Sequence, residues 1–98
     1  MNSVICQAIN NRKLLKLAYH WGFRLVEPHA YGVNNNGHDL LRCYQVGGAS
    51  DSGQPKGWKL FRVDEIHQLH VTEDSFSRPR DGYKRGDTAL DRKIYCQL

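Results

Sequence analysis

The segment Lys56–Leu69 constrains the fold more than any other part of the chain. It starts at a Pro/Gly break and then alternates between two kinds of side chain. One face carries Lys59, Phe61 and Val63, and the other carries Trp58, Leu60 and Arg62. A period of two predicts a strand with two different faces. Asp64 and Glu65 interrupt the alternation before a second apolar set begins at Ile66, so we predict a short turn between two strands.

Arg62 is the unusual member of this strand, because it stands between Phe61 and Val63. A guanidinium in the middle of a strand needs a carboxylate partner, a phosphate-like ligand or open water. Its planar fork suits the paired oxygens of an anion. Two interpretations therefore stay open. Arg62 either contacts an anionic ligand or pairs with one of the acids Glu27, Asp64 and Glu65.

One helix and three further strands are predicted before this segment. The apolar residues of Ser3–Asn10 recur at helical spacing, and Ser3 is a suitable N-cap. Strand patterns cover residues 15–21, 23–33 and 39–46. In the first of these strands, one face carries Leu15, Leu17, Tyr19 and Trp21. Pro28 lies inside the second strand, which must therefore bend or lie at a sheet edge. The run 34–37 predicts a hairpin turn, since Asn and Gly both tolerate positive φ.

With strands at 58–63 and 66–72, the chain has five short strands joined by tight connections or by the exposed loop 47–57. This pattern predicts a mainly β fold, a five-stranded small barrel capped by the N-terminal helix. A length of 98 residues is suited to one core. We assign residues 1–72 to the barrel domain with its helix.

Residues 73–98 differ from the rest and form a C-terminal extension. Its basic residues are Arg78, Arg80, Lys84, Arg85, Arg92 and Lys93, and acids dilute them at Asp81, Asp87 and Asp91. The composition is that of a flexible nucleic-acid arm, but packing on the barrel or on a partner subunit is at least as good an interpretation. Residues 94–96 are either a last strand or a strand that pairs with a second chain.

Composition sets limits on the partners of the chain. A net charge of +4 and a pI of about 9.1 permit an anionic partner without requiring one. The cysteines Cys6, Cys43 and Cys96 are odd in number and far apart, which predicts reduced thiols in a cytoplasmic protein and no disulfide frame. No CxxC spacing occurs, and His67 and His70 fall on opposite faces of a strand, so neither a metal nor another cofactor is expected. Neither a signal sequence nor an apolar run of about 20 residues is present, and no membrane contact is expected.

No set of catalytic residues is convincing in this sequence. The acids Glu27, Asp64 and Glu65 have no inferable paired geometry, and neither a nucleophile elbow nor a Walker loop occurs. A barrel of this size also offers little depth for a pocket. We therefore do not expect an enzyme.

The order of these features resembles the WYL domain, a small Sm-like (SH3-type) barrel common in bacterial transcription regulators. Four pieces carry the resemblance within residues 3–72, namely Leu15-Lys16-Leu17-Ala18-Tyr19, Arg24-Leu25-Val26-Glu27-Pro28, Leu40-Leu41-Arg42-Cys43-Tyr44 and Phe61-Arg62-Val63-Asp64-Glu65-Ile66. The last piece is the most specific. The naming Trp-Tyr-Leu triplet aligns with Asp39-Leu40-Leu41, so this would be a divergent, stand-alone copy. The resemblance implies a regulatory module that senses nucleic acid or a nucleotide-like ligand.

A binding face can be assembled from the basic residues and rings of the predicted barrel. Arg62, Lys59, Arg24 and Arg42 are candidates for phosphate contacts, and Tyr19 and Tyr44 are the rings best placed beside a groove. His29 follows Pro28 at the expected bend and either donates to a phosphate or is simply exposed. The competing interpretation puts most rings in the core and the cations on a solvated face. If the binding face exists, Arg62→Ala should weaken binding of a single-stranded oligonucleotide more than Lys84→Ala.

A second hypothesis needs no ligand at all. Sm-like barrels have free strand edges with which another chain can pair, and the apolar C-terminus at 94–98 could supply such a strand. The protein would then be an interaction or oligomerisation module, for example a homodimer. Binding of a small anionic metabolite or cyclic nucleotide is a third possibility, and it would use the same basic residues as the first.

Overall fold

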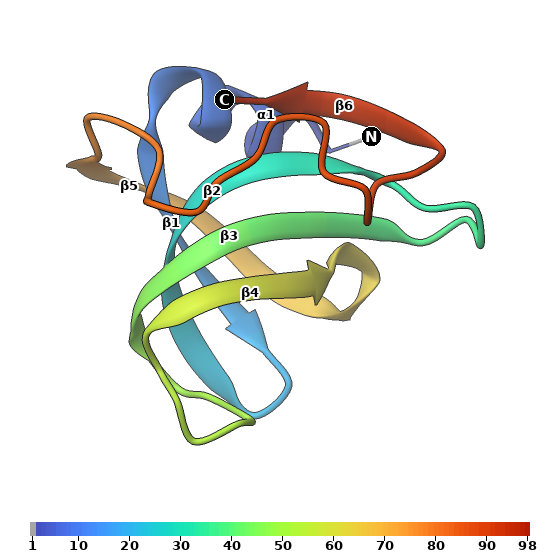
Figure 1. Cartoon of the computed structure of the whole chain (residues 1–98). Coiled ribbons are helices and arrows are strands. Elements are labelled where there is room, and N and C mark those ends of the chain that lie inside the picture. The colour runs from blue at the N-terminus through green and yellow to red at the C-terminus, as the bar shows by residue number, and fades with distance from the viewer. Residues whose placement is uncertain (1) are drawn as a thin grey trace.

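The structure is a computed structural model that describes residues 2–98, and it is mainly β (Figure 1). One helix precedes six antiparallel strands, one strand more than the five predicted. The elements are α1 (Ser3–Asn11), β1 (Lys13–Tyr19), β2 (Gly22–Val33), β3 (Asp39–Gly48), β4 (Gly57–Arg62), a 3₁₀ turn η1 (Val63–Glu65), β5 (Ile66–Ser75) and β6 (Lys93–Gln97). No described helix is long and apolar enough to cross a membrane.

The strands form one strongly curved sheet in the order β4-β3-β2-β1-β5 (Figure 1). β2 is the centre of this sheet, and its two halves have different neighbours. β1 pairs with residues 22–26 of β2, and β6 pairs with residues 30–33 on that side instead. Within residues 2–98, β4 and β5 are the two ends of the path and do not pair with each other. The predicted turn at residues 64–65 is present as η1, which joins these two end strands.

The predicted bend in the second strand is confirmed. Pro28 pairs with Cys43 of β3, and the register then shifts before Ala30 pairs with Arg42. Proline has no N–H to donate to the ladder, so an irregularity at this point costs little. Pro28 therefore sits in the middle of the sheet and not at an edge.

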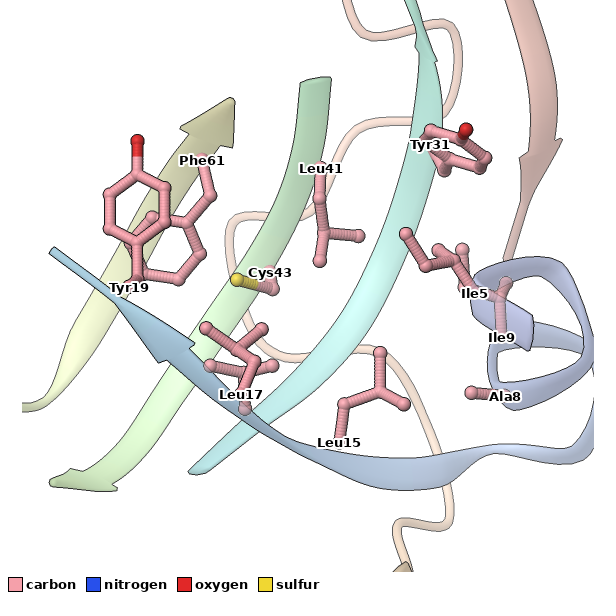
Figure 2. Packing of buried hydrophobic residues seen from close by; sticks show 11 residues of the cluster. Ile5, Ala8, Ile9, Leu15, Leu17, Tyr19, Tyr31, Leu41, Cys43 and Phe61 are labelled. Carbon is pink, nitrogen blue, oxygen red and sulfur yellow. The ribbon is translucent and has the colours of Figure 1, made fainter. Parts of the chain in front are cut away.

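The core lies on the concave face of the sheet and under α1 (Figure 2). The helix contributes Ile5, Ala8 and Ile9, and the strands contribute Leu15, Leu17, Tyr19, Val26, Tyr31, Leu41, Cys43 and Phe61. From Leu15 to Tyr19, β1 buries every second side chain, as the sequence pattern predicts, and Leu14 before them is buried as well. The prediction that Trp21 shares this face is wrong, because Trp21 is 71% exposed. β1 ends at Tyr19, and the following turn through His20 (φ 56°) carries Trp21 away from the core face.

The N-cap of the helix lies one residue earlier than predicted. The Oδ1 of Asn2 accepts hydrogen bonds from the backbone N–H groups of Val4 (3.0 Å) and Ile5 (3.4 Å), so Asn2 and not Ser3 is the N-cap. Both residue types can cap, and the sequence did not distinguish them. The last turn ends at Arg12 in the left-handed region (φ 52°).

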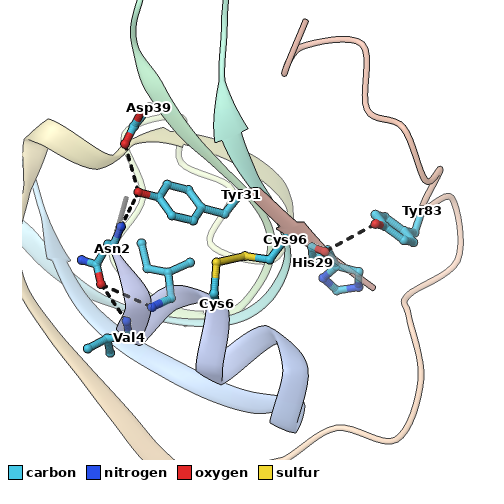
Figure 3. The surroundings of a disulfide bond; sticks show 9 residues. Asn2, Val4, Cys6, His29, Tyr31, Asp39, Tyr83 and Cys96 are labelled. Atoms are coloured by element: carbon cyan, nitrogen blue, oxygen red, sulfur yellow. Dashed lines mark hydrogen bonds between the residues drawn. A yellow bond between two sulfur atoms is a disulfide. The ribbon is translucent and has the colours of Figure 1, made fainter. Parts of the chain in front are cut away.

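The prediction of three reduced cysteines is wrong. A disulfide joins Cys6 of α1 to Cys96 of β6, with Cα atoms 5.7 Å apart (Figure 3). The two cysteines are 90 residues apart in sequence and meet because β6 returns to β2 beside α1. Cys43 alone stays free, and it is buried in the core. Burial raises the pKa of the Cys43 thiol well above its usual range.

The C-terminal extension packs on the convex face of the sheet. It leaves β5, passes over β2 and joins β6, which pairs within the same chain (Figure 1). Trp58 Nε1 donates to the carbonyl of Asp81 (3.1 Å), and Leu90 is 3% exposed in a small second cluster with Ala30 and Leu40. Of the alternatives for residues 94–96, the last strand of the sheet is therefore the one observed.

Candidate ligand-binding site

The seven candidate residues predicted from sequence do not form one face. Three of them, Tyr19, Arg24 and Arg62, lie together where β1, β2 and β4 approach one end of the sheet. Lys59 turns to the β3–β4 loop. The remaining three lie under the C-terminal extension, namely His29, Arg42 and Tyr44.

Arg62 is paired with carboxylates. Its Nη2 lies 2.7 Å from Oδ2 of Asp64, and its Nε lies 3.3 Å from Oε2 of Glu65. Nη2 also lies 3.2 Å from Nδ1 of His38. The hydrogen bond to Asp64 raises the pKa of Arg62. Of the two sequence interpretations, the geometry matches the internal ion pair, although the partner Glu27 lies elsewhere. A ligand anion would have to displace two acids from this guanidinium.

Arg24 is buried, with only 2% exposure, and serves the interior of the sheet end. Its Nη2 donates to the carbonyl of Tyr19 (3.3 Å) and lies 3.3 Å from Oδ1 of Asp51. The guanidinium carbon lies 5.3 Å from the ring centre of Tyr19 and 5.4 Å from that of Phe61. Cation–π contacts and a carboxylate offset part of the cost of burying this guanidinium, whose Nε has no hydrogen-bond partner among the described residues. Arg24 is thus held inside the protein and not presented to a ligand.

His20, which the sequence did not single out, joins these two arginine sites. Its Nδ1 contacts Asp51 (2.5 Å) and its Nε2 contacts Glu65 (2.6 Å). Both ring nitrogens donate only in the imidazolium form. The hydrogen bond to Glu65 is the main cause that raises the pKa of His20. Cations and acids alternate along this end of the sheet, which is therefore not a free basic face.

Lys59 holds a loop. Its Nζ donates to the carbonyl of Gln54 (2.8 Å) and to the hydroxyl of Ser52 (3.3 Å), both in the β3–β4 connection. These bonds explain why a lysine on β4 is half-buried. Lys59 and Arg62 of the same strand therefore have different partners and do not form one basic cluster.

Two arginine–carboxylate pairs fasten the extension to the sheet. Arg42 of β3 makes two bonds to Asp87, from Nε (2.6 Å) and Nη2 (3.4 Å). In the opposite direction, Arg80 of the extension makes two bonds to Glu27 of β2, at 2.7 and 3.0 Å. The Arg80 guanidinium also lies 4.6 Å from the ring centre of Tyr44. Arg42 and Tyr44 are consequently contacts of the extension.

His29 is fully buried between the sheet and the extension. Its Nδ1 donates to the carbonyl of Glu27 (2.8 Å), and its Nε2 accepts from the backbone N–H of Arg80 (3.0 Å). One donor and one acceptor define a neutral imidazole, and burial lowers the pKa of His29 accordingly. Aromatic rings surround it, those of Trp58, Phe76 and Tyr83. His29 is a core histidine here and does not reach an open anion site.

A cavity of about 430 Å³ lies between the convex face and the extension. Arg42 and Trp58 line it from the sheet, and residues 82–88 line it from the extension. The rings of Trp58 and Tyr83 are nearly parallel, with an interplanar angle of 22° and centres 6.2 Å apart. This volume falls within the usual range for small-molecule sites. Trp58 was assigned to a strand from sequence, but nothing local to it indicated that Tyr83 would lie beside it.

Two cations stand in the extension wall of this cavity. Lys84 is exposed and makes no ion pair with any residue in the described range 2–98. Arg85 uses its Nε to bond the carbonyl of Leu98 (2.7 Å). Arg42 adds a third cation, which Asp87 partly neutralises. The cavity therefore combines aromatic rings with positive charge.

A second cavity, of about 500 Å³, borders Arg80. Its lining is formed by Glu27, Tyr44 and residues 75–81. The Glu27–Arg80 ion pair occupies this wall, and no pair of parallel rings lines it among the residues described. It is less suited to an aromatic anion than the first cavity.

No protein-family model matches this chain, and no curated protein or solved structure matches it significantly. The resemblance to the WYL domain therefore stays a prediction from sequence motifs. The class of ligand has to come from the chemistry of the cavity, where Trp58 and Tyr83 offer ring faces and Lys84 and Arg85 offer charge.

Proposed function

We propose that this chain is a WYL-type regulatory module that binds a nucleotide-like anion, either free or as part of single-stranded nucleic acid. The site is the cavity between Trp58 and residues 82–88, which we call the extension cavity. Nucleotides combine a planar base with phosphate, and the extension cavity combines rings with cations. The proposal keeps the ligand class expected from the sequence but moves the site away from Arg62.

The closed Sm-like barrel is also part of this proposal. The strand order β4-β3-β2-β1-β5 and the short η1 link between β4 and β5 support it. In such an arrangement the two end strands curve towards each other around the core. α1 then covers one opening, where Ile5 and Ile9 enter the core.

The ring pair at Trp58 and Tyr83 is the observation that carries the proposed function. The rings come from two distant segments, and both border the extension cavity. Stacking of a base on an aromatic side chain contributes about 1–3 kcal/mol and tolerates every base. The predominantly apolar rings would bind the base, and Lys84 and Arg85 would neutralise its phosphate.

The experiment measures binding of AMP and of a short oligothymidine to the full chain by Trp58 fluorescence. Trp21 is the other tryptophan and is replaced by Phe in all proteins, so that the signal reports the cavity. Lys84→Ala should weaken binding of both probes, and Arg62→Ala should not. Preference for the oligothymidine would identify nucleic acid as the source of the nucleotide. If Arg62→Ala abolishes binding while Lys84→Ala leaves it intact, the site is wrong.

The free edge of β5 supports a second candidate function. β5 spans Ile66–Ser75 and pairs with β1 on one side only. Another chain could pair with its outer side and make the protein an interaction module. The exposed His67, Gln68 and His70 along β5 act against such pairing. Light scattering should therefore give a monomer mass, and a dimer that dissociates on introducing proline at Gln68 would favour this candidate instead.

A further inference from the structure

We propose that the Cys6–Cys96 disulfide controls the extension cavity, so that reduction of this bond weakens ligand binding there. The inference rests on the proposed function for the identity of the ligand. The connection itself rests on contacts of β6, which links the disulfide to the cavity wall.

The last residues of the chain hold the extension wall in place. The carbonyl of Leu98 accepts from Nε of Arg85 (2.7 Å) and from the hydroxyl of Tyr83 (3.2 Å). The side-chain oxygen of Gln97 accepts from the backbone N–H of Gly86 (2.9 Å). Gly86 has a φ of 72°, in the left-handed region that glycine adopts without strain. Three residues of the wall, Tyr83, Arg85 and Gly86, are thus tied to residues 97 and 98.

β6 in turn depends on its anchor at Cys96. The strand is only five residues long, pairs with β2 alone, and carries a register shift after Tyr31. The disulfide to Cys6 attaches it to α1 (Figure 3). Ile5 and Ile9 of this helix are fully buried. Other bonds also reach β6, including one from the hydroxyl of Tyr95 to Asp39 (3.0 Å). Reduction would therefore loosen the end of β6 and leave the core strands intact.

The cysteines differ in access to a reductant. Cys6 and Cys96 are both half-buried, whereas Cys43 has no exposed surface. The raised pKa of Cys43, caused by burial, also keeps it a thiol. Since the thiolate is the nucleophile in exchange, Cys43 does not compete for the disulfide. The chain thus has one reducible bond and one inert cysteine.

The redox step needs a dithiol as reductant. One thiolate of the dithiol attacks a sulfur of the Cys6–Cys96 bond, which breaks, and the other cysteine leaves as a thiolate. The second thiol of the dithiol then attacks the mixed disulfide and releases the first cysteine. Two electrons pass to the protein, the dithiol becomes a cyclic disulfide, and its two protons end on Cys6 and Cys96. Reoxidation by a disulfide reverses these steps.

The test compares AMP affinity of the full chain before and after reduction with dithiothreitol. Ordering a side chain that is mobile before binding lowers the affinity for the ligand. Since Tyr83 and Arg85 both lose their anchor, we expect affinity to fall about tenfold. Cys6→Ser and Cys96→Ser should show the weak affinity with or without reductant. Cys43→Ala is the matched control and should respond to reductant as the unmodified chain does.

Hydrogen exchange gives a second measurement that does not require ligand. Amides of residues 82–86 should exchange faster after reduction, while those of β1 and β3 should not change. Equal AMP affinity in the oxidised, reduced and Cys6→Ser proteins would overturn the redox inference and leave the proposed function standing. No AMP binding in the oxidised protein would instead overturn the proposed function. Unchanged exchange at 82–86, or global unfolding on reduction, would also overturn the inference.

Discussion

Removing Arg80 should cost more stability than removing its partner Glu27, even though both changes break the same ion pair. The Glu27 side chain is only 7% exposed, whereas that of Arg80 is 45% exposed. Without Arg80, the carboxylate stays buried and loses two hydrogen bonds. Without the carboxylate, the guanidinium turns to water. The cost is therefore asymmetric.

The magnitude follows from this burial. Removing one partner of a fully buried pair costs about 3–5 kcal/mol, and an exposed pair is worth at most about 1 kcal/mol. With one partner buried and the other half exposed, we expect Arg80→Ala to lower the free energy of unfolding by about 2–3 kcal/mol. Glu27→Gln keeps the shape and a hydrogen-bond acceptor, so its cost should be about 1 kcal/mol or less.

Urea unfolding at pH 7, followed by far-UV circular dichroism, measures both values. Arg78→Ala is the matched control, because Arg78 is exposed and makes no ion pair within residues 2–98; its effect should stay within about 0.5 kcal/mol. If Arg80→Ala and Glu27→Gln lowered the free energy of unfolding equally, the claim that the unpaired buried carboxylate costs more than the unpaired guanidinium would be refuted. A cost below about 0.5 kcal/mol for Arg80→Ala would refute the claim that this pair fastens the extension.

Three further predictions concern other parts of the fold. Cys6→Ser should remove about 2–4 kcal/mol of stability, the usual value for a disulfide, and lower the melting temperature measured by calorimetry without abolishing folding. The pKa of His20 is raised in the folded state. The contribution of His20 to the free energy of unfolding is therefore complete below the pKa of the unfolded state, near 6.5, and is lost as pH rises through the folded pKa. Amide exchange in the loop at Asp51 should therefore rise with pH more steeply than the intrinsic exchange rate does. A His20→Gln variant should lack this additional rise. Gly48→Ala should lower the free energy of unfolding in urea by more than about 2 kcal/mol, because φ is 97° and a Cβ would collide with the carbonyl of Phe23. Gly47→Ala should be nearly neutral, because a Cβ on Gly47 would meet open space.

Local patterns predicted the β framework well. The alternation after Lys56 became β4, and the interruption at Asp64 became η1, because strand period and turn residues act over a few neighbours. Pro28 indicated its bend for the same reason, since a missing N–H is a property of one residue. The ion pair of Arg62 with Asp64 was also open to sequence inspection, as the two residues are two positions apart.

The extension cavity was beyond such patterns. Arg42 meets Asp87 across 45 positions, and Arg80 meets Glu27 across 53. Neither local composition nor spacing reveals which acid neutralises which arginine at these separations. The same is true of the disulfide, whose partners come from the two ends of the described chain. A basic, turn-rich tail has many ways to pack, and tertiary contacts decide among them.

The most direct measurement of ligand binding is a titration of the ¹⁵N-labelled oxidised chain with AMP, followed by NMR chemical shifts. The indole N–H of Trp58, which donates to the carbonyl of Asp81, is a probe at the extension cavity, and replacing Trp21 by Phe leaves it as the one indole signal. Saturable shifts at this indole and at the amides of Lys84 and Gly86 are the predicted result. Shifts centred on Arg62 and Tyr19, or no saturable shifts at all, would contradict a nucleotide site in the extension cavity.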